Sequence, residues 1–471
     1  MTLINRTDRI EEVEVEKSLD ICKEIAKLNK ERYEKAPGFY IETFGCQQNE
    51  ADSERLAGMC MLMGYVPVSS IDDASLILLN TCAIREHAEK KALSIVGETG
   101  HRKKAAPDTI IGVGGCMVTQ EHRAEKIKMS YPYVSFTFDT GAIHLLPQLV
   151  LNAIQGKKRS FIISDNYGIS EGIPTYRENS FKAWLSVMYG CNNFCSYCIV
   201  PYVRGRERSR RPEDILEEAR QLIAGGAREI TLLGQNVNSY GKDAGFMSIA
   251  QLMREICKIP GDFRLRFMTS HPKDASDELI RVMAEEEKVA KHFHLPVQSG
   301  SNDVLDRMNR KYTVEKYLEI MDKIKAWVPD VSITSDIIVG FPGETDEDFE
   351  KTLELLEKVR YDLIFSFIYS PRIGTPAAEM AEQIPADISG ERFRRMTAMQ
   401  DEISKERNER FLGKKLRVLC EEVSKTDSTV LTGRADSPRP IHFKGDKSLI
   451  GQWVQVDVTE ADKYNLFAKI I

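Results

Sequence analysis

The chain lacks the apolar segments that would place a protein in or across a membrane. No apolar run approaches the ~20 residues of a membrane-spanning helix, and residues 1–37 mix acids and bases without the apolar stretch of a secretory signal. Its content of 42% hydrophobic and 29% charged residues is typical of an ordinary soluble protein. We therefore expect a cytoplasmic protein that makes no contact with a membrane.

A disulfide framework is also missing. Ten cysteines in 471 residues are too sparse for the short scaffolds that disulfides stabilise, so reduced thiols are expected. Four of these thiols lie in ordinary helix or strand patterns and are expected to be plain core residues: Cys22, Cys60, Cys257 and Cys420.

The sequence does contain a compact group of three thiols. Cys191, Cys195 and Cys198 form the pattern C-x3-C-x2-C, with no fourth cysteine. Structural zinc sites and electron-carrying 4Fe-4S clusters normally take four protein ligands, and no histidine that could complete a zinc site occurs between Tyr176 and Asp262. Zinc binding and chance spacing are the weaker alternatives. The pattern favours a four-iron cluster whose free iron binds a substrate.

A second group of cysteines is expected from alternating strand and helix patterns in residues 37–155, which predict an open parallel sheet. Three predicted strands each run directly into a cysteine: 39–44 into Cys46, 75–80 into Cys82 and 109–113 into Cys116. Because the carboxyl ends of parallel strands share one edge of a sheet, these cysteines are predicted to meet as a second metal site. Three unconnected buried thiols are the alternative.

The central part of the chain repeats strand and helix six times. Strands are predicted at 183–187, 229–233, 264–268, 292–296, 333–339 and 363–368. Six units fall short of the eight of a closed barrel. We therefore predict an open-sided, partial (β/α)6 barrel over residues 177–400, with its site at the carboxyl ends of the strands, where the C-x3-C-x2-C loop follows the first strand.

The last part of the chain has the pattern of a small β-barrel. A charged helical stretch at about 389–415 leads to five short predicted strands: 415–421, 429–433, 441–443, 453–458 and 466–470. Such barrels often bind nucleic acid, and eleven Lys or Arg against eight Asp or Glu from Arg410 to Ile471 fit contact with RNA. The predicted fold is α/β, with a charged, solvated and partly helical extension at 1–36, a parallel sheet at 37–155, the partial barrel, and a β-barrel at 410–471.

One basic run follows the cysteine loop in a chain whose net charge is −6: Arg204, Arg206, Arg208, Arg210 and Arg211. On an extended segment, the first four would share one face. We predict that Arg204 and Arg206 contact nucleic-acid phosphates at the mouth of the barrel. A solvated or internally paired loop is an equal alternative.

Taken together, these modules resemble the methylthiotransferase family of radical S-adenosylmethionine enzymes from about Pro37 to Ile471. Besides the cysteine pattern, three strings carry the resemblance: TFGCQQN at 43–49, CIVPYVRGRERSR at 198–210 and LLGQNVNSY at 232–240. Gln48 departs from the family's pattern, which usually has Met there. Gln48 lies beside the expected ligand Cys46 and is not itself expected to be a ligand.

The resemblance implies that a methylthio group replaces hydrogen at position 2 of an adenine next to the tRNA anticodon, whose N6 already carries an isopentenyl group. That C–H bond is not acidic enough for an ordinary side-chain base, so cofactors must carry the step. Two [4Fe-4S] clusters and two molecules of S-adenosylmethionine are implied. The cluster that generates the deoxyadenosyl radical would lie on Cys191, Cys195 and Cys198, and the cluster that presents the sulfur on Cys46, Cys82 and Cys116.

The resemblance also implies contacts and partners. Tyr197 stands where the family keeps an aromatic residue against the adenine of S-adenosylmethionine. Further cofactor contacts are expected at the predicted strand ends: Gly234, Gln235, Asn236 and Ser270. The expected partners are the anticodon region of tRNA and a reducing electron donor, and the protein is expected to act as a monomer.

Two other functions stay open from the sequence. One is a sister activity on threonylcarbamoyladenosine in tRNA or on an aspartate of a ribosomal protein, against which Gln235, Asn236 and Asn238 argue. The other is a non-catalytic, metal-stabilised RNA-binding protein. Iron and acid-labile sulfide would separate an enzyme with clusters from a zinc protein.

Overall fold

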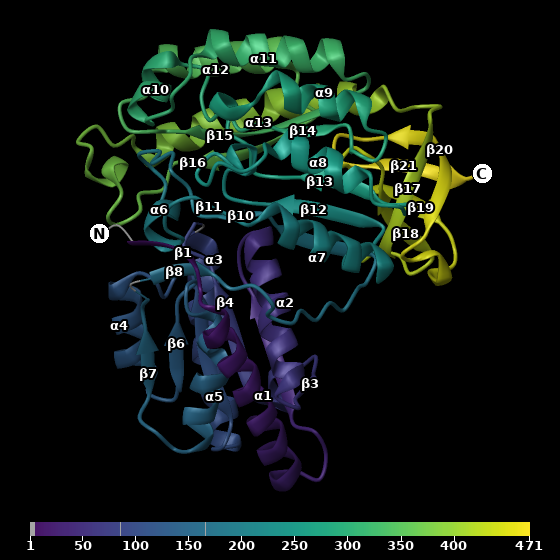
Figure 1. Cartoon of the computed structure of the whole chain (residues 1–471). Coiled ribbons are helices and arrows are strands. Elements are labelled where there is room, and N and C mark those ends of the chain that lie inside the picture. The colour runs from purple at the N-terminus through teal and green to yellow at the C-terminus, as the bar shows by residue number, and fades with distance from the viewer. Residues whose placement is uncertain (1–4, 85, 165) are drawn as a thin grey trace.

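Three modules follow one another along the chain in the computed structural model, which describes residues 5–84, 86–164 and 166–471. The N-terminal module lies against one side of a central barrel, and a small C-terminal barrel covers one end of it (Figure 1). Within the described ranges, no helix is both long and apolar enough to cross a membrane.

The N-terminal module is built on a six-stranded, wholly parallel sheet in the order β3-β2-β4-β5-β6-β7. Its elements are β1 (Asn5–Arg9), α1 (Glu12–Arg32), β2 (Gly38–Thr43), α2 (Gln47–Leu62), β3 (Val66–Pro67), β4 (Ala74–Thr81), α3 (Glu86–Ala105), β5 (Ile110–Gly115), α4 (Glu121–Ser130), β6 (Phe136–Phe138), α5 (Leu146–Ile154), β7 (Ser160–Ile162) and β8 (Asn166–Ile169). The predicted open parallel sheet is confirmed. Its strand order reverses between β2 and β4, the kind of switch point at which such sheets bind ligands.

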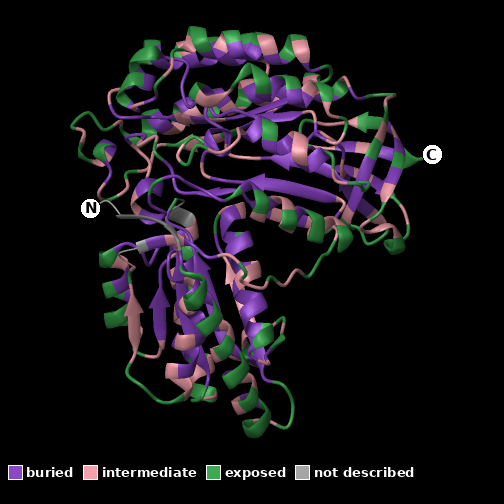
Figure 2. Cartoon of the chain, in the orientation of Figure 1, coloured by how far each residue is buried: buried purple, intermediate pink, exposed green. Residues whose placement is uncertain are grey.

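The prediction of a solvated extension at the N-terminus is wrong. Helix α1 packs on α2 and α5, and β1 pairs in parallel with β8. The helix buries Val15, Ser18, Cys22, Ile25 and Asn29. These residues recur every three or four positions, so they form one stripe that faces the core while the charged residues face solvent (Figure 2).

The central module contains the six predicted parallel strands, confirming the open partial barrel. They form two three-stranded sheets, β9-β12-β13 and β14-β15-β16, and a bridge pairs Leu265 of β13 with Val289, three residues before β14. The elements are β9 (Lys182–Ser186), β10 (Met188–Tyr189), α6 (Val200–Val203), β11 (Arg208–Ser209), α7 (Pro212–Ala224), β12 (Glu229–Leu233), α8 (Ile249–Cys257), β13 (Arg264–Phe267), α9 (Asp277–Glu285), β14 (His292–His294), α10 (Asn302–Arg307), α11 (Val314–Trp327), β15 (Ser332–Val339), α12 (Asp346–Val359), β16 (Leu363–Ile368) and α13 (Ala386–Glu409). The helices cover the outside of the strands, whose residues are mostly buried (Figure 2).

The C-terminal module is a closed five-stranded barrel in the order β17-β18-β19-β21-β20, as predicted. Its strands are β17 (Lys415–Val423), β18 (Val430–Arg434), β19 (Ile441–Lys444), β20 (Trp453–Ala461) and β21 (Leu466–Ile470). Alternate residues of these strands, such as Val418, Leu431 and Val456, fill a small core of its own.

This small barrel packs against the amino ends of the central strands, away from the cysteine loop. Arg264, the first residue of β13, donates hydrogen bonds to the carbonyl oxygens of Ala435 and Arg417. The Trp453 ring lies near the guanidinium groups of Arg264 and Arg417, at 4.6 and 4.2 Å from its centroid. The interface therefore depends on arginines at the amino-terminal end of the barrel.

The carboxylate of Glu229 lies close to several cationic side chains of this interface. Glu229, at the start of β12, is 3% exposed. It accepts from Arg266 Nε at 2.7 Å, and Arg264 Nη1 and Lys182 Nζ lie at 3.3 and 3.8 Å from its oxygens. Burial alone would raise the pKa of Glu229, but the charges of Arg266, Lys182 and Arg264 outweigh burial and lower the pKa to about 2.

We expect Glu229→Gln to lower the free energy of unfolding by about 3 kcal/mol near neutral pH, because the buried guanidinium groups lose their counter-charge. The folded pKa is below the ordinary value of 4.5, so this stabilisation is present above pH 4.5 and is lost as the pH falls toward 2. Denaturant unfolding of both proteins from pH 7 downward should show the difference shrinking below pH 4.5.

The matched control is Glu217→Gln, which removes an exposed ion pair with Arg220. It should change the free energy of unfolding by less than about 0.5 kcal/mol. Equal losses in the two variants, or a Glu229 effect that does not depend on pH, would contradict this account of the interface.

Candidate active site

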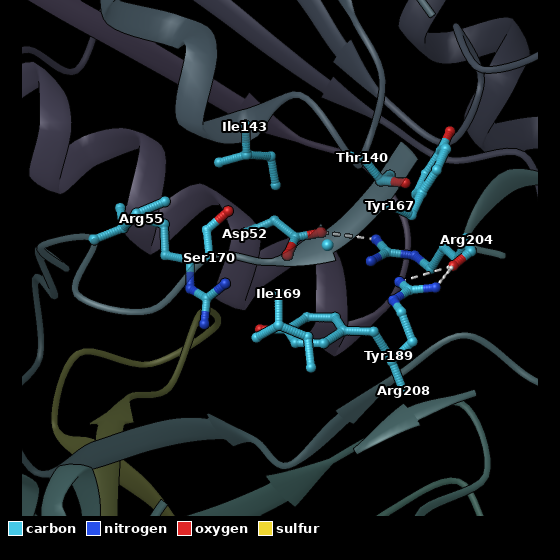
Figure 3. Close-up of a pocket in the computed structure, with 13 residues that line it drawn as sticks. Asp52, Arg55, Thr140, Ile143, Tyr167, Ile169, Ser170, Tyr189, Arg204 and Arg208 are labelled. Atoms are coloured by element: carbon cyan, nitrogen blue, oxygen red, sulfur yellow. Dashed lines mark hydrogen bonds and ion pairs between the residues drawn. The ribbon is translucent and has the colours of Figure 1, made fainter. Parts of the chain in front are cut away.

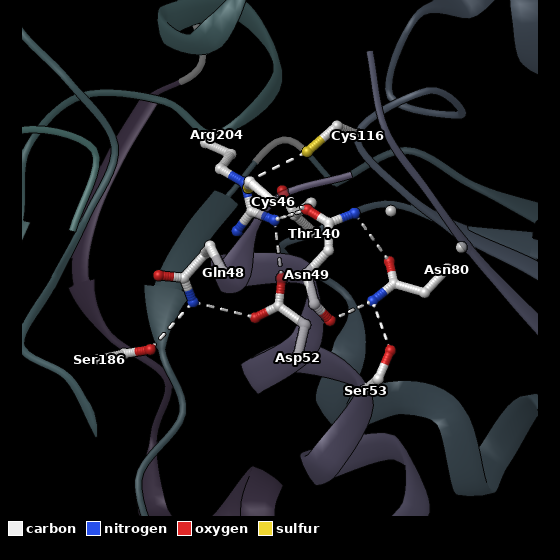
Figure 4. A network of polar contacts seen from close by, with 12 residues as sticks. Cys46, Gln48, Asn49, Asp52, Ser53, Asn80, Cys116, Thr140, Ser186 and Arg204 are labelled. Carbon is white, nitrogen blue, oxygen red and sulfur yellow. Dashed lines mark hydrogen bonds and ion pairs between the residues drawn. The ribbon is translucent and has the colours of Figure 1, made fainter. Parts of the chain in front are cut away.

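The three cysteines of the N-terminal module lie at the carboxyl edge of its sheet. Cys46 follows β2 and precedes the first residue of α2, Cys82 follows β4, and Cys116 follows β5. The Sγ of Cys46 is 3.6 Å from the Oδ1 of Asn49. The same oxygen accepts from Arg204 Nη2 at 2.9 Å, and Arg204 Nε donates to the Sγ of Cys116 at 3.2 Å (Figure 4). Cys46 and Cys116 therefore belong to one polar network.

Cys82 lies beside the same edge. A Cβ atom added to Gly45, the neighbour of Cys46, would be 2.9 Å from the Cys82 Sγ, and the Ile84 N–H donates to that sulfur at 3.3 Å. Burial raises the pKa of the Cys116 thiol to about 12, and the charge of Arg204 opposes that rise. Arg204 thus favours the anionic sulfur that binds metal.

The donor set of this edge consists of thiols. In the part of the chain that the structure describes, no group of three or more His, Cys, Asp or Glu side chains is arranged to hold a single metal ion. A 4Fe-4S cluster binds each thiolate through a different iron, so a group of three thiols matches the ligands that it takes.

Buried amides brace this edge. The Asn49 side chain donates to the carbonyl oxygens of Phe44 and Thr81, both at 3.0 Å, and Asn80 donates to Ser53 Oγ at 3.0 Å. These bonds tie the turns after β2 and β4 to the start of α2. These residues were not predicted from the sequence, although the polar residues at the start of α2, which are buried, are a local signal for them.

The second thiol group lies in the loop between β10 and α6. Cys191 and Cys195 are buried, and Cys198 is partly exposed. The Gly190 N–H donates to Gln235 Oε1. On the other side of the loop, Asn309 Nδ2 donates to the Phe194 carbonyl at 2.8 Å. The loop is therefore held from both sides of the barrel mouth.

A buried arginine contacts this thiol group as well. Arg310, which is 7% exposed, donates from Nη1 to Cys195 Sγ at 3.4 Å and from Nη2 to the Pro296 carbonyl at 2.8 Å. Arg310 and Arg204 thus have equivalent positions, each beside one sulfur of a thiol group. Arg310 lies far from the cysteines in the sequence, in an ordinary loop between two helices, so no local pattern marked it.

Buried polar atoms without protein partners gather at the neighbouring strand ends. Among the described residues, Asn236 Oδ1, Ser270 Oγ and Gln298 Oε1 have no hydrogen-bond partner. Leaving such an atom unsatisfied costs about 1–3 kcal/mol, so this edge is suited to a polar ligand. Thr269 and Gln298 also have positive φ values of 68° and 76°, and strained backbone concentrates at binding sites. Gln298 was not among the residues selected from the sequence.

The other residues expected to contact the cofactor are Gln235, Gly234 and Tyr197, and each has different neighbours in the structure. Gln235 accepts from the cysteine loop, as described above. A Cβ at Gly234 would lie 2.5 Å from Met188 Cγ, so a larger residue at this position would displace the Met188 side chain. Tyr197 is half-buried and packs against a small apolar cluster that includes Met308 and Phe341.

The basic run does not form the common exposed face that the sequence suggested. The segment is not one extended strand, because α6 ends at Val203 and only Arg208 and Ser209 belong to β11. Arg210 is buried and paired with Glu171 and Glu218. Of the five arginines, Arg206 and Arg211 are exposed.

The two arginines expected to contact phosphate have different positions. Arg204 is 4% exposed, and its Nη2 is 2.8 Å from Asp52 Oδ2. Its guanidinium lies inside the protein, so the phosphate contact expected for Arg204 is wrong in this structure. Arg206 is exposed, with its guanidinium 5.2 Å from the centroid of the Phe194 ring, and its contact with phosphate stays a prediction.

A small cavity borders the Arg204–Asp52 pair (Figure 3). It has a volume of about 30 Å³, and its lining includes Arg55, Tyr189 and Arg208. That volume suits one or two water molecules and excludes a nucleotide. The thiol edge is the better candidate for chemistry.

Family models match all three modules. Residues 38–139 match the uncharacterized protein family UPF0004, residues 185–356 the radical SAM superfamily and residues 409–471 the TRAM domain. A three-cysteine loop after the first strand of an open (β/α)6 barrel, together with the second match, defines a radical S-adenosylmethionine protein, a class that uses a [4Fe-4S] cluster and S-adenosylmethionine.

Similar proteins identify the family more specifically than the family models do. The tRNA-2-methylthio-N(6)-dimethylallyladenosine synthase of a Thermoanaerobacter species is 48% identical over 464 residues, 98% of both chains. The synthases of Acetivibrio thermocellus and Carboxydothermus hydrogenoformans are 48% and 49% identical, over 96% and 91% of this chain and 95% and 98% of theirs. The chain belongs to the family of tRNA-2-methylthio-N(6)-dimethylallyladenosine synthases, which confirms the resemblance.

A solved structure shares the fold. The radical S-adenosylmethionine methyltransferase TsrM from Kitasatospora setae, with cobalamin and a [4Fe-4S] cluster bound, aligns with a TM-score of 0.54. The alignment covers 73% of this chain and 77% of that one at 13% identity. At this identity, the likeness concerns the fold alone.

Proposed function

We propose that this protein adds a methylthio group to position 2 of N6-dimethylallyladenosine next to the tRNA anticodon. The observation that supports the proposal is the contact of the short helix α6 and Arg204, which follow the last cysteine of the barrel loop, with Cys116 of the N-terminal module. Residues 198–204 run from the last cysteine of the barrel loop to an arginine that contacts Cys116. The names of the relatives indicate the substrate.

The barrel residues would bind the first cluster and its nucleotide. Cys191, Cys195 and Cys198 would hold a [4Fe-4S] cluster, and the unsatisfied atoms of Asn236 and Ser270 would bind S-adenosylmethionine. When bound, these groups supply the one-electron chemistry that an unreactive C–H bond requires. The protein contributes a site whose polar atoms are already fixed at the strand ends.

The N-terminal edge would hold a second [4Fe-4S] cluster on Cys46, Cys82 and Cys116. Helix α2 begins directly after Cys46, so its positive end favours the negative charge of a thiolate-bound cluster. Arg204 adds a hydrogen bond to the sulfur of Cys116. The use of two molecules of S-adenosylmethionine, a reducing electron donor and a monomeric state belong to the same proposal.

The triple variant of Cys46, Cys82 and Cys116 to Ala should keep one cluster and still cleave S-adenosylmethionine, but form no methylthio product, because the sulfur donor is gone. Cys195→Ala should abolish both reactions. Iron, sulfide, 5′-deoxyadenosine and modified nucleosides would be measured on each preparation, and the tRNA of cells carrying each variant would be analysed.

The matched control replaces three core thiols, Cys22, Cys60 and Cys257, by Ala, which should leave iron and sulfide unchanged. Methylthio product from the first triple variant would contradict the proposal that the cluster on Cys46, Cys82 and Cys116 supplies the sulfur. In cells that carry the first triple variant, the modification of threonylcarbamoyladenosine or of a ribosomal protein is the alternative one to be lost. If it were lost and the dimethylallyl nucleoside were unaffected there, the result would support the sister activity. Zinc without sulfide would support a binding protein.

Gly45→Ala tests the geometry of the N-terminal edge. Gly45 has a φ of +118°, which residues with side chains rarely adopt, and its added Cβ would lie 2.6 Å from the Cβ of Cys82. We expect the displaced thiol to lower iron affinity at this edge by on the order of 10-fold. Gly97→Ala is the control, since an added Cβ there meets no atom within 4 Å. Equal iron content in the two variants would contradict the assignment.

Arg206→Ala tests contact with tRNA. If Arg206 neutralises one phosphate, its loss should reduce the log-log slope of affinity against salt by about one. Arg220→Ala, on the outer face of α7, is the control and should leave the slope unchanged because Arg220 pairs with Glu217. Binding isotherms at several salt concentrations measure both, and identical slopes would leave Arg206 a solvated residue.

A further inference from the structure

Residues 198–204 connect the two thiol groups directly. Cys198 belongs to the barrel loop, α6 follows it, and Arg204 lies at the end of α6. Ile199 and Val203 pack with Ala83 and Cys116 of the N-terminal module. In addition, Thr140 Oγ1 donates to the Val203 carbonyl at 2.9 Å. Helix α6 therefore packs on the N-terminal module, and Cys198 of the barrel loop precedes it by two residues.

Arg204 makes three polar contacts across this interface (Figure 4). Its Nε donates to Cys116 Sγ at 3.2 Å, and its Nη2 donates to Asn49 Oδ1 and Asp52 Oδ2 at 2.9 and 2.8 Å. A guanidinium is planar and rigid, so three such bonds fix its position more tightly than an ammonium group could. Both Arg204 and Asp52 are almost fully buried.

Gln48, which departs from the family's pattern, contacts Asp52, the acidic partner of Arg204. Gln48 Nε2 lies 3.3 Å from Asp52 Oδ1 and 3.0 Å from the Oγ of Ser186, the last residue of β9. A methionine at position 48 could donate neither bond. In this chain, both carboxylate oxygens of Asp52 are therefore engaged, one by the barrel's arginine and one by an amide that also reaches the barrel.

We propose that Arg204 is a positioning residue of the N-terminal thiol group, which holds Cys116 at a fixed place relative to Cys198 and supplies a hydrogen bond to its sulfur. The inference rests on the proposed function, because it concerns a cluster on Cys46, Cys82 and Cys116. It assigns to Arg204 a role within the protein in place of the RNA contact suggested by the sequence.

The contact has a measurable electronic consequence. Hydrogen bonds to cluster sulfurs and nearby positive charge favour the reduced, more negative state of an iron–sulfur cluster, and they set its reduction potential. Without Arg204, a cluster on this edge is harder to reduce. The potential should therefore move to a more negative value when Arg204 is replaced, while iron can still be bound by the three thiolates.

The test uses the full chain with Cys191, Cys195 and Cys198 changed to Ala, so that one cluster remains to be measured. In this parent, Arg204→Met is combined with Asp52→Asn, which avoids a buried unpaired carboxylate. Iron and sulfide are quantified, and a redox titration followed by electron paramagnetic resonance gives the midpoint potential. We expect a potential more negative than in the parent, and a smaller shift for Arg204→Lys, which keeps the charge without the fork.

Two controls separate this contact from general damage. Arg210→Met removes another buried, paired arginine of the same segment that contacts no cysteine, and Gln48→Met leaves the bond from Arg204 to Cys116 in place. Both should keep the parent's potential. An unchanged potential in the Arg204 variants, or an equal shift in the Arg210 variant, would overturn the inference. A parent without iron and sulfide would instead overturn the proposed function.

Discussion

The organisation of this protein depends on one constraint: hydrogen-bonded parallel strands end at the same edge of a sheet. The N-terminal sheet and the central barrel are both parallel, so each has a single edge where loops with reactive side chains collect. The two modules meet near these edges, with α2 packed against β9. Thiols from separate sequence regions can therefore face one another without any long or irregular connection.

Charge at this meeting point is balanced within the protein. The chain has a net charge of −6, and Arg204, Arg210 and Arg310 are buried beside sulfur or carboxylate. Burying a cation is unfavourable unless a partner of opposite charge or good hydrogen bonds compensate. Each of these arginines has such partners, so Arg204 and Arg210 of the basic run join parts of the fold.

Most of the framework could be predicted from the sequence, because strand periodicity and turn residues are local signals. The positions of β2, β4 and β5, with a cysteine after each, follow from such signals, and so do the six barrel strands. Arg310 could not be found in this way, since its role depends on contacts between loops far apart in the chain. The role of Arg204 was misjudged because charge in a sequence does not reveal whether its partner comes from solvent or from another module. For α1, the apolar stripe was present but was masked by the many charges between its members.

The placement of the C-terminal barrel sets a length scale. It covers the amino ends of the central strands, whereas the cysteine loop lies at their carboxyl ends. The strand β15, with eight residues, spans roughly 26 Å at about 3.3 Å per residue. An RNA that touches both the small barrel and the cysteines must extend along the flank of the central barrel over that distance. The depth of the central barrel would then fix the distance between the part of the RNA on the small barrel and the base that reaches the sulfur.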